Sequence, residues 1–192
     1  MFSWKKDNPY SWFKLTEDQI RLLQDKVDWD WVIRHSYHLQ FSEEFLLEFQ
    51  DKFGWELISR NKVSETFIRS HQDKMDWSNI SIFQKLSENF MREFKDKLNW
   101  RSISECQKNL SEEFIREFAN RMDWWRISTY QRFSENFIRE FADKLDWRQM
   151  SWTQVLSEDF IEEHANKVDW VLIFRFQKVS DKFKEKYKDK IK

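Results

Sequence analysis

Glycine and proline are nearly missing from this chain. Its 192 residues include one glycine, Gly54, and one proline, Pro9, whereas average usage would be roughly 7% and 5%. Folds rich in strands and turns need many residues that adopt positive φ or preset a turn. Their scarcity argues against β-rich and loop-rich folds and favours helices.

Cysteine, long hydrophobic runs and net charge are also scarce. Cys106 is the only cysteine, which excludes an intramolecular disulfide framework and fits a reducing compartment. Residues 1–10 lack the apolar core of a signal peptide, and no window approaches the roughly 18 apolar residues of a membrane span. With 33 basic and 34 acidic residues, the total charge indicates no partner class. We expect a cytoplasmic protein without membrane association.

The abundant aromatic residues recur at regular intervals. Each copy of the pattern starts at a Ser or Thr, from Thr16 to Ser157. A marker Trp always follows 13 residues after this start, as Trp124 follows Ser111. The interval from that Trp to the next start varies, and it is longest after Trp29 and shortest after Trp55. This pattern predicts a tandem repeat of about 23 residues with one fixed and one variable half. The S-E-x-F motif begins at Ser42, Ser64, Ser87, Ser111, Ser134 and Ser157, with looser copies at Thr16 and Ser180.

The fixed half predicts an amphipathic helix of about 12 residues, called helix B. Apolar residues stand 3, 4, 7 and 11 positions after the Ser, the spacing of one helix face. The Ser is a favoured N-cap, and a Glu follows in the first turn, where the helix dipole favours negative charge. Oppositely charged residues four apart predict weak ion pairs on the exposed face; two examples are Glu112/Arg116 and Glu140/Lys144.

The variable half, D-W-x-x-I-S-x-x-Q-x-L, predicts a helix of about 9 residues, called helix A. Asp, Asn99 or Gly54 precedes the marker Trp and is an acceptable N-cap. Apolar residues around each cap predict hydrophobic staples, so the helices can join with almost no loop. We expect the marker Trp to face the structural core of the repeats: Trp29, Trp55, Trp77, Trp100, Trp124, Trp147 and Trp170.

A glutamine seven positions after most marker Trp residues shares the core-facing side of helix A. A buried amide needs hydrogen-bond partners, so we expect a ladder from these side chains to neighbouring backbone. Ligand contact is the less favoured alternative. The glutamines are Gln84, Gln107, Gln131, Gln154 and Gln177.

The predicted fold class is all-α. Helices this short are not stable alone in water, and stacked copies bury a continuous core. We therefore predict an α-solenoid of about 7.5 two-helix repeats that forms a single domain over residues 1–192. Residues 1–15 are an atypical N-terminal cap, 16–179 are the repeats, and 180–192 are a C-terminal capping helix, in which Lys184 replaces an apolar residue.

The unit L-S-E-x-F-I-x-x-F-x-D-K-[LV]-D-W-x-x-I-S-x-x-Q resembles a short repeat of uncharacterised proteins from bacteriophages and large DNA viruses. The resemblance covers nearly the whole chain. It brings no assigned activity and no catalytic residues. It implies a viral or phage accessory protein in the host cytoplasm, including one that binds and blocks a host factor.

Residue patterns of catalysis and metal binding are missing from the sequence. No phosphate-binding glycine loop, nucleophile elbow, zinc-protease helix or paired C-x-x-C occurs. His71 and His164 stand where other copies have Phe, which favours a core role over metal binding, and Cys106 also stands at a packing position. The spacing of His35 and His38 is a weak metal signal. We expect no enzyme, no cofactor and no metal.

The variable positions of helix A, at 1, 2, 5, 6 and 8 after the Trp, predict a surface away from the core. The helix A segments contain eleven basic and three acidic residues, with aromatic residues between them. Solenoids present such faces to partners, so we predict a binding scaffold for a protein. Nucleic acid, a nucleotide or another polyanion is the alternative. A solvated basic face without a partner also fits these residues. The predicted partner-binding face comprises Arg60, Lys85, Arg101, Trp125, Arg126, Tyr130, Arg148, Trp152 and Arg175.

Overall fold

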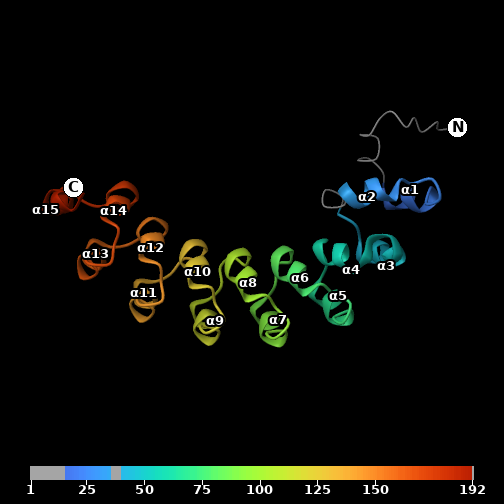
Figure 1. The fold of residues 1–192 in the computed structure, drawn as a ribbon, viewed down its shortest axis with the longest axis horizontal. Helices are drawn as coiled ribbons and strands as arrows, with labels where there is room; N and C mark the ends of the chain where they lie inside the picture. The colour runs from blue at the N-terminus through green and yellow to red at the C-terminus, as the bar shows by residue number, and fades with distance from the viewer. Residues whose placement is uncertain (1–15, 36–39, 192) are drawn as a thin grey trace, which may run out of the picture. The chain divides into compact units, whose positions relative to one another are not determined.

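A computed structural model describes residues 16–35 and 40–191 (Figure 1). Every regular element in these two ranges is a helix, and no strand occurs in them. The predicted all-α class is confirmed. The predicted cap of residues 1–15 and the residue His38 lie outside the described ranges.

The helices alternate between the two predicted types. The B helices are α1 (Glu17–Leu22), α3 (Glu43–Glu48), α5 (Glu65–Ser70), α7 (Glu88–Glu93), α9 (Glu112–Glu117), α11 (Glu135–Glu140), α13 (Glu158–Glu163) and α15 (Asp181–Tyr187). The A helices are α2 (Trp29–His35), α4 (Gln50–Arg60), α6 (Trp77–Phe83), α8 (Trp100–Cys106), α10 (Trp124–Tyr130), α12 (Trp147–Thr153) and α14 (Trp170–Phe176). A 3₁₀ helix, η2 (Lys188–Ile191), follows α15.

The repeats form two compact units, residues 1–98 and 99–192. In the first unit α2 contacts α4, and α4 contacts α6; in the second, α8, α10, α12 and α14 contact one another in order. Figure 1 shows α8, α10, α12 and α14 along one side of the second unit and α9, α11 and α13 along the other. Each unit is thus a stack of two-helix repeats, as predicted for an α-solenoid. The single domain over 1–192 stays a prediction.

Both helix types are shorter than the sequence pattern predicts. Most A helices have seven residues, as in α12, and the B helices before α15 have six, as in α11. Helix B ends because its plus-7 residue leaves helical geometry; Phe141 has φ −109° and ψ 23°. Helix A ends because the following Gln is extended. The apolar residue at plus 11 is still held by a backbone hydrogen bond, such as Leu145 N to Phe141 O at 3.1 Å.

The predicted N-caps are confirmed. The hydroxyl of Ser134 accepts a hydrogen bond from Phe137 N (3.2 Å), and a carboxylate oxygen of Asp146 accepts one from Gln149 N (2.9 Å). Gly54 is the exception, because its φ of 69° and ψ of 156° kink α4 and belong to a region that only glycine adopts readily. The same Ser bond occurs at Ser42, Ser64, Ser87, Ser111, Ser157 and Ser180, and the Asp or Asn bond at Asp76, Asn99, Asp123 and Asp169.

The marker Trp residues pack between consecutive repeats. Trp124, for example, stacks on Phe141 with ring centroids 4.9 Å apart, and its indole N–H donates to Ala119 O at 3.0 Å. Trp100 and Trp170 are buried, and the other five are partly buried. The indole N–H of Trp29, Trp77, Trp147 and Trp170 likewise donates to a carbonyl of the preceding turn, so these residues and Trp124 join that turn to the next B helix.

A glutamine ladder joins successive A helices of the second unit. The Gln131 amide donates to Gln107 O (2.7 Å), that of Gln154 donates to Gln131 O (2.8 Å), and that of Gln177 donates to Gln154 O (2.8 Å). Each side-chain oxygen also accepts a backbone N–H, as Gln154 does from Phe133 at 3.0 Å. In the first unit the Gln84 amide donates to Asn61 O at 2.6 Å. The expected ladder is confirmed for these four glutamine side chains.

A buried serine four positions after the marker Trp makes a second link between repeats. The hydroxyl of Ser128 donates to Trp124 O (2.7 Å) and accepts from the backbone N–H of Asp146, the cap of the next A helix (2.9 Å). Ser59, Ser104 and Ser151 make the same two bonds. The repeated Ser of D-W-x-x-I-S thus positions the following cap.

The B helices are linked by charged residues. The backbone N–H of Ser134 donates to Glu112 of the preceding repeat at 2.6 Å, so the repeated Glu does more than complement a helix dipole. Arg116 contacts Glu112 in its own helix (3.5 Å) and Glu140 in the next repeat (2.7 Å). The predicted pair Glu140/Lys144 is wrong, because the helix ends between them and the Lys144 ammonium lies over Trp124 instead.

Replacing one ladder glutamine should destabilise the fold strongly. In Gln154→Ala the buried carbonyl of Gln131 and the N–H of Phe133 lose their partner, which should lower the free energy of unfolding by about 2–3 kcal/mol. Chemical denaturation followed by circular dichroism measures this loss. Asn120→Ala, at an exposed position after α9, is the control and should change stability by less than about 0.5 kcal/mol. Equal effects would contradict the role of the ladder.

The ion pairs between B helices predict a pH-dependent contribution to stability. The hydrogen bond from Arg139 lowers the pKa of Glu163 below its ordinary value. A carboxyl whose pKa is lower in the folded state stabilises the protein above its unfolded pKa, and this contribution disappears as pH falls through the folded pKa. Glu163→Gln should therefore be less stable than the unsubstituted chain at neutral pH, and the difference should vanish in acid. Denaturation across pH measures it, with Glu113→Gln as the control. A constant difference would contradict the assignment.

Candidate partner-binding surface

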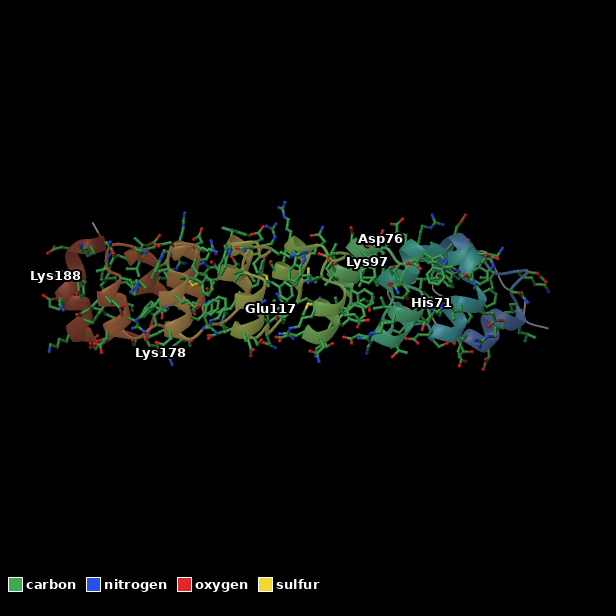
Figure 2. All side chains as sticks on the ribbon, turned by 90° about the horizontal axis from the view of Figure 1, so that it is seen from below. His71, Asp76, Lys97, Glu117, Lys178 and Lys188 are labelled. Carbon is green, nitrogen blue, oxygen red and sulfur yellow. The ribbon has the colours of Figure 1, made fainter. Side chains whose placement is uncertain are left out.

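Most of the predicted partner-binding face is exposed. Arg60 and Lys85 in the first unit are exposed, as are Arg101, Arg148 and Arg175 in the second. All the predicted residues of the second unit lie on the consecutive helices α8, α10, α12 and α14, and among them Arg126 alone is partly buried. Lys178 is the next basic residue after Arg175, and its side chain extends outward at the edge of the view in Figure 2.

Large aromatic side chains stand on the second unit's A helices. Trp125 and Phe176 are each 49% exposed, Trp152 is 44% exposed and Tyr130 is 37% exposed. Trp152 and Phe176 come from adjacent repeats, and their ring centroids are 6.1 Å apart. The four rings stand on the neighbouring helices α10, α12 and α14, and together with the exposed aliphatic residues of the same helix A segments they are called the aromatic and aliphatic region.

Sequence reasoning missed the aliphatic part of this region. Val155 is 90% exposed and Val171 is 56% exposed. Val155 stands 8 positions after its marker Trp, as the predicted Lys85 does, and Val171 stands 1 position after, as the predicted Arg148 does. Their position in the repeat could have identified them, but the predicted face was restricted to charged and aromatic residues.

Cations cover one face of several of the exposed rings. The Lys108 ammonium lies 4.5 Å from the centroid of Tyr130, and the guanidinium of Arg175 lies 5.3 Å from that of Phe176. Lys108 also donates to Glu105 O at 2.9 Å, at the end of α8. Some of the basic residues are therefore engaged with the protein's own rings and helix ends.

Arg126 differs from the other predicted binding residues. Its side chain is 16% exposed and forms ion pairs of 2.7 Å with both Glu105 and Asp123. The hydrogen bond that Arg126 donates to Glu105 raises the pKa of Arg126 above its ordinary value. By contrast, the Arg148 side chain is 76% exposed and lies 3.9 Å from Asp169. Arg126 links α8 to α10 and is poorly available to a partner.

His71 and His164 take part in packing, and Cys106 is partly buried. His164 is buried, stacks on Trp147 with centroids 4.8 Å apart, and shares a hydrogen bond with Phe160 O at 3.1 Å. His71 stacks on Trp55 in the same way. Burial raises the pKa of the Cys106 thiol, which favours the less reactive protonated form. In residues 16–35 and 40–191 no three His, Cys, Asp or Glu side chains gather as a metal site.

No protein-family model, curated protein or solved structure matches the chain. Within the described ranges, no helix is long and apolar enough to cross a membrane.

The contrast between Arg126 and Arg148 can be measured. Arg126→Ala should lower the midpoint of chemical denaturation, because Glu105 and Asp123 lose their shared cation. Arg148→Ala should leave the midpoint unchanged, because its side chain is largely solvated. Both variants are compared with the unsubstituted protein in the same buffer. Equal midpoints for the two variants would show that Arg126 has no structural role.

Proposed function

We propose that the protein is a non-enzymatic scaffold that binds a protein partner through the A helices of its second unit. The partner presents acidic side chains around an apolar patch. The observation that carries this proposal is the exposed group of Trp125, Tyr130, Trp152 and Phe176, surrounded by arginine and lysine. Trp, Tyr and Arg are the residues that most often dominate the energetics of protein interfaces.

The charge of the surface favours an acidic partner. The helix A segments between Trp100 and Val179 contain seven basic residues and one acidic residue, Glu105. Glu105 is already paired with Arg126. An acidic partner would be attracted to this surface, and its apolar residues could pack on Val155, Trp152 and Phe176. Complementary charge raises the rate of association and fixes orientation.

A protein suits the surface better than a single-stranded nucleic acid. Nucleic-acid platforms stack bases on open aromatic faces. Here Lys108 covers a face of Tyr130, Arg175 covers a face of Phe176, and Trp152 leans on Phe176 at 52°. The protein's own cations thus already cover one face of Tyr130 and one face of Phe176, which leaves less open ring surface for stacked bases. Polyanion binding through the same basic residues is the competing function, favoured by the excess of positive charge.

The resemblance of the repeat to phage and viral proteins suggests the setting for this function. Under the proposal, the partner is a host protein in the host cytoplasm, and the scaffold blocks it by covering an acidic and apolar surface. The binding face consists of exposed positions that differ from repeat to repeat, so the face can vary while the inward positions keep the fold.

The test compares two triple variants in quantitative affinity capture. Arg148→Ala, Trp152→Ala and Arg175→Ala together remove cations and an aromatic residue from the proposed face. The matched control replaces Glu113, Asn120 and Asn166, exposed residues on the B-helix side, by Ala. We expect the first variant to lose a protein that the unsubstituted chain captures, and the control variant to retain it. With the scaffold and this partner both purified, the first variant should bind the partner at least about tenfold more weakly than the unsubstituted chain does.

Retention of every captured protein by the first variant would contradict the proposed face. The polyanion alternative is measured separately, as the affinity of the unsubstituted protein for a single-stranded oligonucleotide at two salt concentrations. Steep salt dependence together with affinity above the non-specific level would favour that alternative.

A further inference from the structure

A cation lies over five of the seven marker Trp rings. It is contributed by the residue ten positions after the next Ser, and its charged group stands 5.0–5.8 Å from the ring centroid. The pairs are Lys74/Trp55, Lys97/Trp77, Arg121/Trp100, Lys144/Trp124 and Lys167/Trp147. The repeat is therefore built to place a cation on the face of its Trp.

The structure shows which groups hold an ammonium at this position. The ammonium of Lys97, besides covering Trp77, donates to the side-chain oxygen of Gln72 at 2.9 Å and lies 3.7 Å from Asp73. Lys167 repeats the arrangement with Asp143, at 2.9 Å. The binding groups are thus an indole face, a carboxylate nine positions after the preceding start residue and, at Lys97, an amide.

At Trp29 the same groups line an open cleft. Gln24, Asp25 and Trp29 occupy the positions of Gln72, Asp73 and Trp77 in their repeats. They border a cleft of about 480 Å³ that is also lined by Val27, Glu48, Phe49, Asp51 and Lys52. Lys52 stands at the position of the covering cation, yet in the described part of the chain no cationic group lies over Trp29, nor over Trp170.

The cleft is acidic and its aromatic wall is fixed. Three carboxylates, Asp25, Glu48 and Asp51, line it with one cation, Lys52. Glu48 is paired with Arg21 at 2.6 Å, whereas Asp25 and Asp51 form no ion pair within the described residues. The Trp29 ring is held by Phe49 at 4.9 Å and by its indole N–H, which donates to Gln24 O at 3.1 Å.

We propose that this cleft binds an alkylammonium group from outside the chain, either a lysine side chain of another protein or a free primary amine. The ammonium lies over the indole of Trp29 and pairs with Asp25, as Lys97 does with Trp77 and Asp73. Asp51 adds negative charge at the rim. This site is in the first unit and does not depend on the partner-binding face of the second.

The experiment titrates the ¹⁵N-labelled full chain with n-butylammonium chloride and, separately, with N-acetyl-lysine-N-methylamide. Sodium chloride and n-butanol are the controls for ionic strength and for apolar binding. The indole N–H signal of Trp29, assigned with Trp29→Phe, reports on the cleft. We expect a saturable shift with a millimolar dissociation constant for both ammonium compounds and none for n-butanol. Tighter binding of the lysine derivative identifies a protein side chain as the ligand, and equal binding identifies a free amine.

Two carboxylate variants provide a matched comparison. Asp25→Asn should weaken binding at least about threefold, because the ammonium loses its ion pair. Asp73→Asn should leave binding unchanged, because that carboxylate serves Lys97. No saturable shift at Trp29, or an equal loss in both variants, would overturn the proposal. So would binding that appears only in Lys52→Met, since Lys52 would then fill the cleft itself.

Discussion

A glutamine amide fixes the position of one repeat against the one before it at Gln84 in the first unit and at Gln131, Gln154 and Gln177 in the second. Helices as short as α11 and α12 have too few internal hydrogen bonds to persist alone in water, and an aromatic core does not by itself specify how far one repeat slides along the next. Gln154 removes this freedom, because its amide pairs with a carbonyl and an N–H of the preceding repeat. The alignment of caps, ring stacks and exposed residues between neighbouring repeats depends on this contact.

The fold could be predicted from the sequence as far as each feature is local. The constant interval between start and marker Trp, and the caps at Ser134 and Asp146, need no knowledge of the neighbouring repeat. The predicted length of helix B and the pair Glu140/Lys144 were wrong for one reason: spacing alone does not reveal that the backbone departs from helical geometry at Phe141. Helix A was predicted too long because the same kind of spacing does not reveal that the backbone is extended at Gln154. The link from Glu112 to Ser134 depends on how repeats align in space, so it was not predictable.

The candidate surfaces, too, could be predicted only where a feature depends on its own repeat. The exposure of Arg148 and Trp152 follows from their position on the helix, since the core side was recognisable from the repeated Trp and Gln. The burial of Arg126 depends on Glu105 of the preceding repeat, and intervals of variable length concealed that pairing. The cleft at Trp29 depends on where Lys52 lies, although the same residue type at the same register covers Trp55 and Trp77.

The link from the first-turn glutamate to the next serine bears on how such a chain can evolve. Glu112 satisfies Ser134, Glu135 satisfies Ser157, and Glu158 satisfies Ser180, so each of these copies offers the acceptor that its successor requires. Removal or duplication of one whole copy by recombination would join an intact acceptor to an intact donor and leave no orphaned polar group at the seam. The number of repeats can therefore change during evolution while the exposed residues diversify.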